Sequence, residues 1–130
     1  MTRADFQNVA EVRLEDARIL LENGRYEGAY YLCGYAVECA LKACIAKATK
    51  AEEFPPRDAS KLYIHDPERL AVFAGPDVRD ALIGRAEWTV VVLWEETSRY
   101  ERRAEADARA LYQAVSDPAD GVLACIRKFW

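Results

Sequence analysis

The chain has 130 residues, of which 52% are hydrophobic and 31% are charged, and its formal net charge is −4. This composition argues against a disordered chain and predicts a single globular domain over residues 1–130. The negative charge argues against broad, sequence-independent nucleic-acid binding over the whole surface, but it leaves room for a local basic site. The first residues lack the apolar segment of a signal peptide, so we expect a cytoplasmic protein.

The N-terminal part of the chain carries the pattern of an amphipathic helix. Thr2 and Asp5 have the spacing of a capping box. Asn23 and Gly24 supply a C-terminal stop, because glycine adopts positive φ without strain. Between these two signals we expect one helix. Its buried face is predicted from apolar residues at steps of three and four: Phe6, Ala10, Leu14, Ala17 and Leu21.

Residues 26–48 form the stretch around which the rest of the chain is expected to pack. Only Glu38 and Lys42 are charged between residues 28 and 46, alanine recurs and proline is missing. The pattern predicts a helix that is apolar almost all round and therefore enclosed by neighbours. The two charges interrupt the run near its middle, which argues against a membrane span. Gly34 indicates that another helix backbone approaches closely.

After this second helix the pattern is more interrupted. We interpret residues 50–63, which contain Phe-Pro-Pro and several charges, as an exposed loop. Asp66 and Pro67 have the arrangement of an N-cap and a first helical residue, which predicts a short helix. Gly75 and Pro76 would end that helix and begin the next.

Residues 77–100 are interpreted as one helical segment. The run Thr-Val-Val-Val-Leu-Trp at residues 89–94 has high strand propensity. We reject a strand because no other segment offers a partner strand, and because Val78, Leu82 and Leu93 keep helical spacing. The sequence thus favours an uninterrupted helix here.

The same segment carries more apolar surface than one neighbouring helix would need. Large apolar side chains stand close together at Trp88, Val92 and Trp94. Spare aromatic surface on a small helical protein indicates a subunit interface. We therefore expect a homodimer with these three residues at its interface.

The last part of the chain contains two further helical patterns. Residues 102–115 read as a charged helix, and Ser116, Asp117 and Pro118 give a cap-and-proline start for a last short helix. Together the patterns predict an all-α fold, namely an antiparallel, up-and-down bundle of four to five helices with short extra helices.

Sequence signals for metal or cofactor chemistry are missing. The four cysteines lack the C-x-x-C spacing of metal sites, and we interpret them as apolar core residues. His65 is the single histidine, and its position before Asp66 favours a capping or packing role. Glycine-rich phosphate loops do not occur. We expect no metal and no cofactor.

Two features are left that could carry a function. Glu38 lies in the enclosed helix, where it pairs either with Lys42 one turn away or with an arginine from another helix. The second feature is a run of arginines around an aromatic residue, which suits contact with phosphates and bases. Its alternative interpretation is a solvated helix face with ordinary ion pairs. The candidate residues of the run are Arg99, Tyr100, Arg102 and Arg103.

Several of these segments resemble the HEPN family (higher eukaryote and prokaryote nucleotide-binding domain). Residues 18–27 read Arg-Ile-Leu-Leu-Glu-Asn-Gly-Arg-Tyr-Glu, and residues 34–42 read Gly-Tyr-Ala-Val-Glu-Cys-Ala-Leu-Lys. His65-Asp66 before a short helix and Ser98-Arg99-Tyr100 follow in the order typical of the family. The most specific part is the run over residues 24–43. The tail from Asp117 carries no family signal.

The resemblance implies an antiparallel helical bundle that pairs as a dimer. Many members are metal-independent RNA endonucleases in toxin–antitoxin, antiphage or RNA-processing systems. Others are partners of small nucleotidyltransferase-like proteins, and some bind nucleotides or RNA without cutting them. Each of these functions is thereby an expectation for this chain.

The nuclease branch of the family uses an arginine followed, after a short spacer, by a histidine. Arg99 matches the arginine, but Ala104, Glu105 and Ala106 stand where the histidine would be. Cleavage at a 2′-hydroxyl needs a proton acceptor near neutral pH, which a solvated carboxylate beside arginines does not provide. We therefore expect a non-catalytic member that binds RNA, a nucleotide or a partner, with Glu38 orienting Arg99. The alternatives are a ribonuclease toxin with an altered site and a purely structural interaction module.

Overall fold

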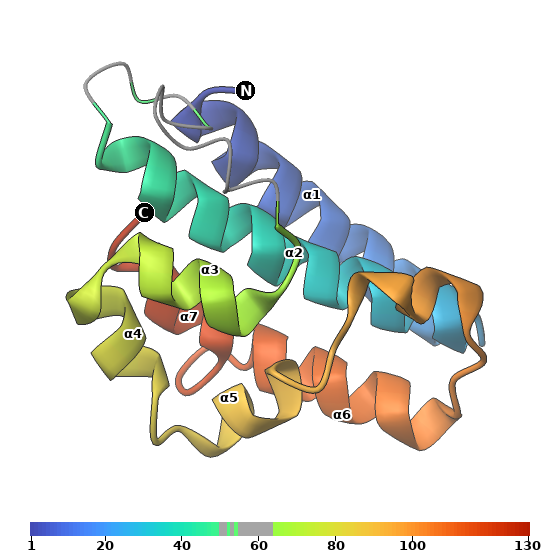
Figure 1. Ribbon diagram of the computed structural model, residues 1–130. Coiled ribbons are helices and arrows are strands. Elements are labelled where there is room, and N and C mark those ends of the chain that lie inside the picture. The colour runs from blue at the N-terminus through green and yellow to red at the C-terminus, as the bar shows by residue number, and fades with distance from the viewer. Residues whose placement is uncertain (50–51, 53, 55–63) are drawn as a thin grey trace.

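The computed structural model describes residues 1–49, 52, 54 and 64–130, and within these ranges the chain forms helices and no strand (Figure 1). This confirms the all-α prediction and the rejection of a strand at residues 89–94. The expected loop at residues 50–63 lies almost wholly outside the described residues. The elements are α1 (Arg3–Glu22), α2 (Tyr26–Lys47), α3 (Pro67–Ala74), α4 (Pro76–Leu82), α5 (Ala86–Val91), the 3-10 helix η2 (Glu96–Tyr100), α6 (Glu105–Ser116) and α7 (Val122–Arg127).

Helix α2 is the centre of the structure. It lies antiparallel to α1 along one side, while α3, α6, α7 and η2 pack on its other sides (Figure 1). Most of its residues from Ala29 to Ala46 are buried, as the apolar sequence predicts. The bundle is therefore built from two long antiparallel helices, the shorter α6, and several short helices wrapped around α2.

The first helix begins and ends where its sequence signals predict. The Thr2 hydroxyl accepts a hydrogen bond from the Asp5 backbone N–H, and the Asp5 carboxylate accepts one from the Thr2 N–H. Gly24 has φ +74°, which lets the chain turn at once into α2. The N-cap at Asp66 is also confirmed, since its carboxylate accepts from the Glu68 N–H at 3.0 Å.

The prediction of one helix over residues 77–100 is wrong. Gly84, at φ +90°, separates α4 from α5, and the chain then leaves helical geometry before η2. Leu93, which keeps helical spacing with the buried Val78 and Leu82, is 72% exposed, whereas the adjacent Trp94 is buried. Each break changes the direction of the chain, so the three short segments α4, α5 and η2 do not share one helical spacing. The last two helices also begin later than predicted. Helix α6 begins at Glu105 and not at residue 102, and α7 begins at Val122 and not at residues 116–118.

The expected dimer surface at Trp88 and Trp94 is likewise corrected. Both side chains are buried inside their own chain, because Trp88 and Trp94 are 6% and 1% exposed. The Trp94 ring lies directly over Gly34 and stacks on Tyr31 with the ring centroids 6.0 Å apart. Gly34 thus makes room for an indole ring and not for a helix backbone. Val92 is half-buried.

The contact between Gly34 and Trp94 can be tested by Gly34→Ala. An added Cβ would lie 2.3 Å from the indole ring, so the ring or the helix must move. We expect the free energy of unfolding to fall by about 1–3 kcal/mol in urea denaturation, although alanine alone would favour helix by ~1 kcal/mol.

Gly28→Ala on the same helix is the matched control. Its Cβ would lie 3.2 Å from Cδ1 of Leu20, the free end of a flexible side chain. That variant should keep or raise the free energy of unfolding. Equal effects of the two substitutions would contradict the role assigned to Trp94.

Candidate functional site

The buried carboxylate of Glu38 has two partners. The residue is 1% exposed, and Lys42, one turn along α2, donates from Nζ to Oε2 at 2.9 Å. Nδ1 of His65 lies 3.1 Å from both carboxylate oxygens. Lys42 in turn faces the Phe54 ring, with Nζ 5.2 Å from its centroid. The pair with Lys42 is therefore confirmed, whereas no arginine among the described residues contacts Glu38.

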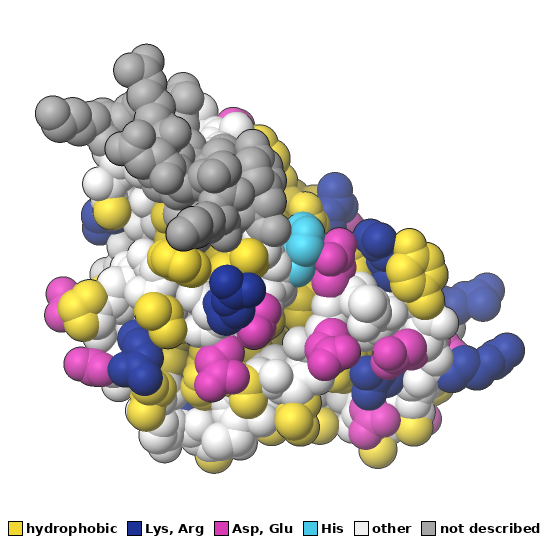
Figure 2. All heavy atoms as spheres, in the orientation of Figure 1, with side chains coloured by type: hydrophobic (Ala, Val, Ile, Leu, Met, Phe, Trp, Pro, Cys, Tyr) yellow, Lys and Arg dark blue, Asp and Glu magenta, His cyan; other side chains and the backbone are white. Residues whose placement is uncertain are grey.

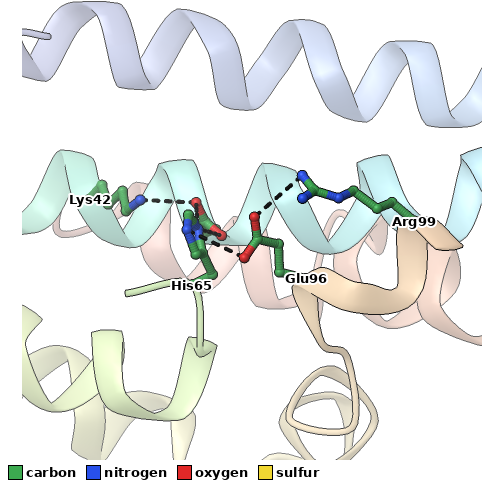
Figure 3. A network of polar contacts seen from close by, with 5 residues as sticks. Lys42, His65, Glu96 and Arg99 are labelled. Carbon is green, nitrogen blue, oxygen red and sulfur yellow. Dashed lines mark hydrogen bonds and ion pairs between the residues drawn. The ribbon is translucent and has the colours of Figure 1, made fainter. Parts of the chain in front are cut away.

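His65 extends this pair into a network that reaches η2. Because a carboxylate only accepts hydrogen bonds, Nδ1 of His65 carries the proton that faces Glu38. On the other side of the ring, Nε2 lies 3.4 Å from Oε2 of Glu96. Oε1 of Glu96 lies 3.4 Å from Nη1 of Arg99. Figure 3 shows the resulting chain of contacts, which runs from Lys42 on α2 to Arg99 on η2.

The network places Glu38 and Arg99 in one site without direct contact. From the sequence we expect Glu38 to orient Arg99, but in the structure His65 and Glu96 lie between these two residues. Neither of these two residues was predicted as a site residue. The available signal was that His65 is the single histidine of the chain and lies inside the HEPN-like pattern.

Arg99 and Tyr100 form an open platform at the end of η2. The guanidinium carbon of Arg99 lies 4.7 Å from the centroid of the Tyr100 ring, and Tyr100 is 78% exposed. Arg102 follows, exposed and without an ion pair to any described residue. In Figure 2, Lys and Arg side chains alternate with Asp and Glu side chains on the right-hand side of the molecule. Below we refer to Arg99, Tyr100 and Arg102 as the arginine–tyrosine strip.

Arg103 has a different position from the other arginines. Its guanidinium carbon lies 4.3 Å from the centroid of the Tyr30 ring on α2, and it pairs with Glu101 at 2.8 Å. Its side chain is 25% exposed. Arg103 therefore anchors the segment after η2 to α2 and offers less of its charge to a ligand than Arg99 or Arg102.

A pocket of about 320 Å³ opens beside the network. Its lining combines carboxylates and the imidazole with two apolar side chains, and in Figure 2 acidic side chains lie next to the histidine. We call it the acidic pocket. Its lining residues are His65, Asp66, Glu68, Val92, Trp94, Glu95 and Glu96.

The cysteines do not contribute to this site. All four are buried and free of disulfides. Burial raises the pKa of the Cys39 thiol to about 11 and that of Cys44 to about 12, and it raises the pKa of Cys33 further. Thiols with such pKa values carry almost no thiolate at neutral pH, so they are poor nucleophiles. In the described part of the chain, no group of three or more His, Cys, Asp or Glu side chains is arranged to hold a metal ion.

The family of the chain follows from a comparison with protein-family models. The HEPN domain model matches residues 5–75, which is more than half of the chain. The chain belongs to the HEPN family. The matched range contains Glu38, Lys42 and His65, and it ends before η2, so Arg99 and Tyr100 lie beyond it. No curated protein and no solved structure matches the chain.

Membership in the HEPN family makes the chain a helical module whose function is connected with nucleotides or RNA. None of the helices in the described part of the chain combines the length and the apolar character that crossing a bilayer requires. The site itself consists of a buried acid–base network that leads to a solvent-exposed pair of arginine and tyrosine.

The Glu38–Lys42 pair can be tested by Glu38→Gln. This substitution leaves the ammonium of Lys42 buried without a counter-charge, so we expect the free energy of unfolding to fall by about 3 kcal/mol in chemical denaturation. Adding Lys42→Met removes the unpaired charge at similar volume, and the double variant should recover a large part of the loss. A double variant less stable than Glu38→Gln would contradict the assignment of Lys42 as the main partner.

Proposed function

We propose that this HEPN domain binds RNA or a nucleotide through the arginine–tyrosine strip, without cleaving it. The observation that carries the proposal is the exposed Tyr100 ring with the Arg99 guanidinium beside it. An open aromatic face can stack a base, and a guanidinium can contact a phosphate with two hydrogen bonds. Arg102 adds a second cation that no described residue neutralises.

The buried network supports this proposal because it holds the strip in place. Glu96 contacts Nε2 of His65, and Nδ1 of His65 contacts the buried carboxylate of Glu38 on α2. Arg99 is thus oriented by Glu96 on its own 3-10 helix, and Glu96 is in turn linked through His65 to Glu38 on the central helix α2. A pre-positioned guanidinium loses less conformational entropy when it binds a ligand.

Binding should depend on the ring of Tyr100 and on the charge of Arg99. We expect Tyr100→Ala and Arg99→Ala each to weaken binding of a fluorescent single-stranded RNA by at least about fivefold, since one stacked base contributes ~1–3 kcal/mol. Fluorescence anisotropy at fixed salt measures the dissociation constant.

Two variants serve as matched controls for this experiment. Tyr100→Phe keeps the aromatic face and should retain binding. Arg18→Ala removes an equally exposed arginine on α1, which pairs with Glu15 and Glu22, and should leave the affinity unchanged. An affinity that is the same in all four variants would refute binding at the strip and favour a purely structural interaction module.

A second candidate function is metal-independent RNA cleavage. The observation in its favour is that His65 is 43% exposed and has its Nδ1 fixed by a buried carboxylate, which is how a histidine base is commonly oriented. The first proposal is preferred because Nε2, the atom that would take the proton, faces the carboxylate of Glu96. Cleavage of RNA by the wild type that is lost in both His65→Ala and Arg99→Ala would establish this second function.

We further propose that the protein acts in the cytoplasm as a homodimer, in a toxin–antitoxin, stress or defence setting, together with a nucleotidyltransferase-like protein. The support is the family to which the chain belongs and the apolar side chains that remain exposed, such as Leu93 and Phe73. Sedimentation equilibrium of the full chain should give twice the mass of one chain. A single-chain mass at all accessible concentrations would refute the dimer.

A further inference from the structure

The imidazole of His65 lies between two carboxylates, one at each ring nitrogen. Nδ1 is 3.1 Å from both oxygens of Glu38, and Nε2 is 3.4 Å from Oε2 of Glu96 (Figure 3). Of the described carboxylates, only these two lie within ion-pair distance of the ring. A neutral imidazole carries one proton, so it can act as a donor to only one of them. A favourable contact with both therefore requires a second proton on the ring.

We propose that the protonation of His65 controls how strongly the arginine–tyrosine strip binds RNA or a nucleotide. The inference rests on the proposed function, because it assigns a regulation to that same surface. Histidine is the side chain whose charge ordinarily changes near physiological pH. His65 is the single histidine of the chain, and its side chain is partly exposed, so protons reach the ring from the solvent.

Glu38 decides which of the two ring nitrogens gains and loses the proton. Its carboxylate is buried, pairs with Lys42 at 2.9 Å and can only accept a hydrogen bond from the ring. Nδ1 of His65 therefore keeps its proton toward Glu38. The proton that comes and goes is the one on Nε2, on the side of the ring that faces Glu96.

Glu96 is shared between His65 and Arg99. Its Oε2 faces Nε2 of the ring, and its Oε1 lies 3.4 Å from Nη1 of Arg99. With Nε2 protonated, Glu96 lies between two cations and occupies only part of the Arg99 guanidinium, which keeps further N–H groups for a phosphate. Without that proton, Nε2 turns a lone pair toward the carboxylate, and Arg99 is the one cation left to Glu96 among the described residues. Arg99 is then neutralised by its own neighbour and binds a phosphate less well.

The remaining charged groups around the ring act in the same direction. The central helix contributes Glu38 together with Lys42, whose charges balance. The start of α3 and the segment that leads into η2 contribute further carboxylates, namely Asp66, Glu68 and Glu95. A second proton on the ring offsets part of this negative charge, which repels the phosphates of a ligand at the strip. RNA affinity is therefore expected to rise as the pH falls and His65 becomes protonated.

The test measures binding of a fluorescent oligouridylate by anisotropy at fixed salt, at about pH 5.5 and at about pH 8. Uracil keeps its charge over this range, so the change comes from the protein. We expect the affinity to be about two- to fivefold higher at the lower pH, since the contact is one partly exposed ion pair. Glu96→Gln should remove most of this difference, because an amide both donates and accepts and so suits Nε2 with or without its proton.

Glu95→Gln is the matched control. It removes the same charge from the neighbouring position, at a residue that lines the acidic pocket but is not one of the two carboxylates that contact the ring. This variant should keep the pH dependence of the wild type. An affinity of the wild type that does not change with pH would overturn the proposal. A pH dependence that Glu96→Gln retains in full, or that Glu95→Gln loses equally, would overturn it too.

An NMR titration without RNA separates a failure of this inference from a failure of the proposed function. The ring C–H signals of His65 need no assignment, because the chain has a single histidine. The Cδ–H signals of Arg99 should change with the same midpoint in the wild type and stay constant in Glu96→Gln. Arg99 signals that do not follow the ring would overturn the link. A joint titration without RNA binding at either pH would refute the strip as the RNA site, and with it the regulation of binding, while the link from His65 to Arg99 stands.

Discussion

The enclosed carboxylate of Glu38 is the constraint on which the rest of the site depends. A charge inside an apolar helix is tolerated only when it is paired and hydrogen-bonded, and here an ammonium and an imidazole meet that requirement. The need for these partners ties α2 to the segment before α3 and, through Glu96, to η2. Because the buried carboxylate needs these partners, three separate parts of the chain take up a defined arrangement around it.

The same helix shows how packing fixes the neighbouring surface. Gly34 leaves space for the Trp94 ring, and the ring stacks on Tyr31. Trp94 lies directly before the segment that becomes η2, so its seat on α2 determines where that short helix begins. The position of the exposed strip therefore follows from a tryptophan in the core as well as from the polar network.

Much of the architecture could be predicted from the sequence, since local signals decide it. The capping box at Thr2 and Asp5, the stop at Gly24 and the cap at Asp66 act within a few residues, and the apolar run of α2 indicates its burial directly. The prediction of one helix over residues 77–100 is wrong because the helical spacing there is compatible with one helix or with several. Gly84, which adopts positive φ and separates α4 from α5, was not recognised as a helix break. Trp88 and Trp94 were assigned to an interface because composition does not tell an inward from an outward aromatic ring.

The candidate site was only partly predictable for a related reason. Glu38, Arg99 and Tyr100 stand out in the sequence by burial, charge and aromatic character. His65 and Glu96 matter through contacts between segments that are 27 and 31 residues apart along the chain or further, and no local pattern reveals such contacts. His65 also has an ordinary explanation as a residue next to a helix cap.

The HEPN match ends at residue 75, while the strip begins more than 20 residues later. The matched range is connected to η2 and the residues after it by the contact between His65 and Glu96, by Arg103 on the Tyr30 ring and by the packing of Trp94 on Gly34. Substitutions in and after η2 would change the exposed residues at this end of the molecule, while α2 keeps the buried carboxylate of Glu38 paired with Lys42.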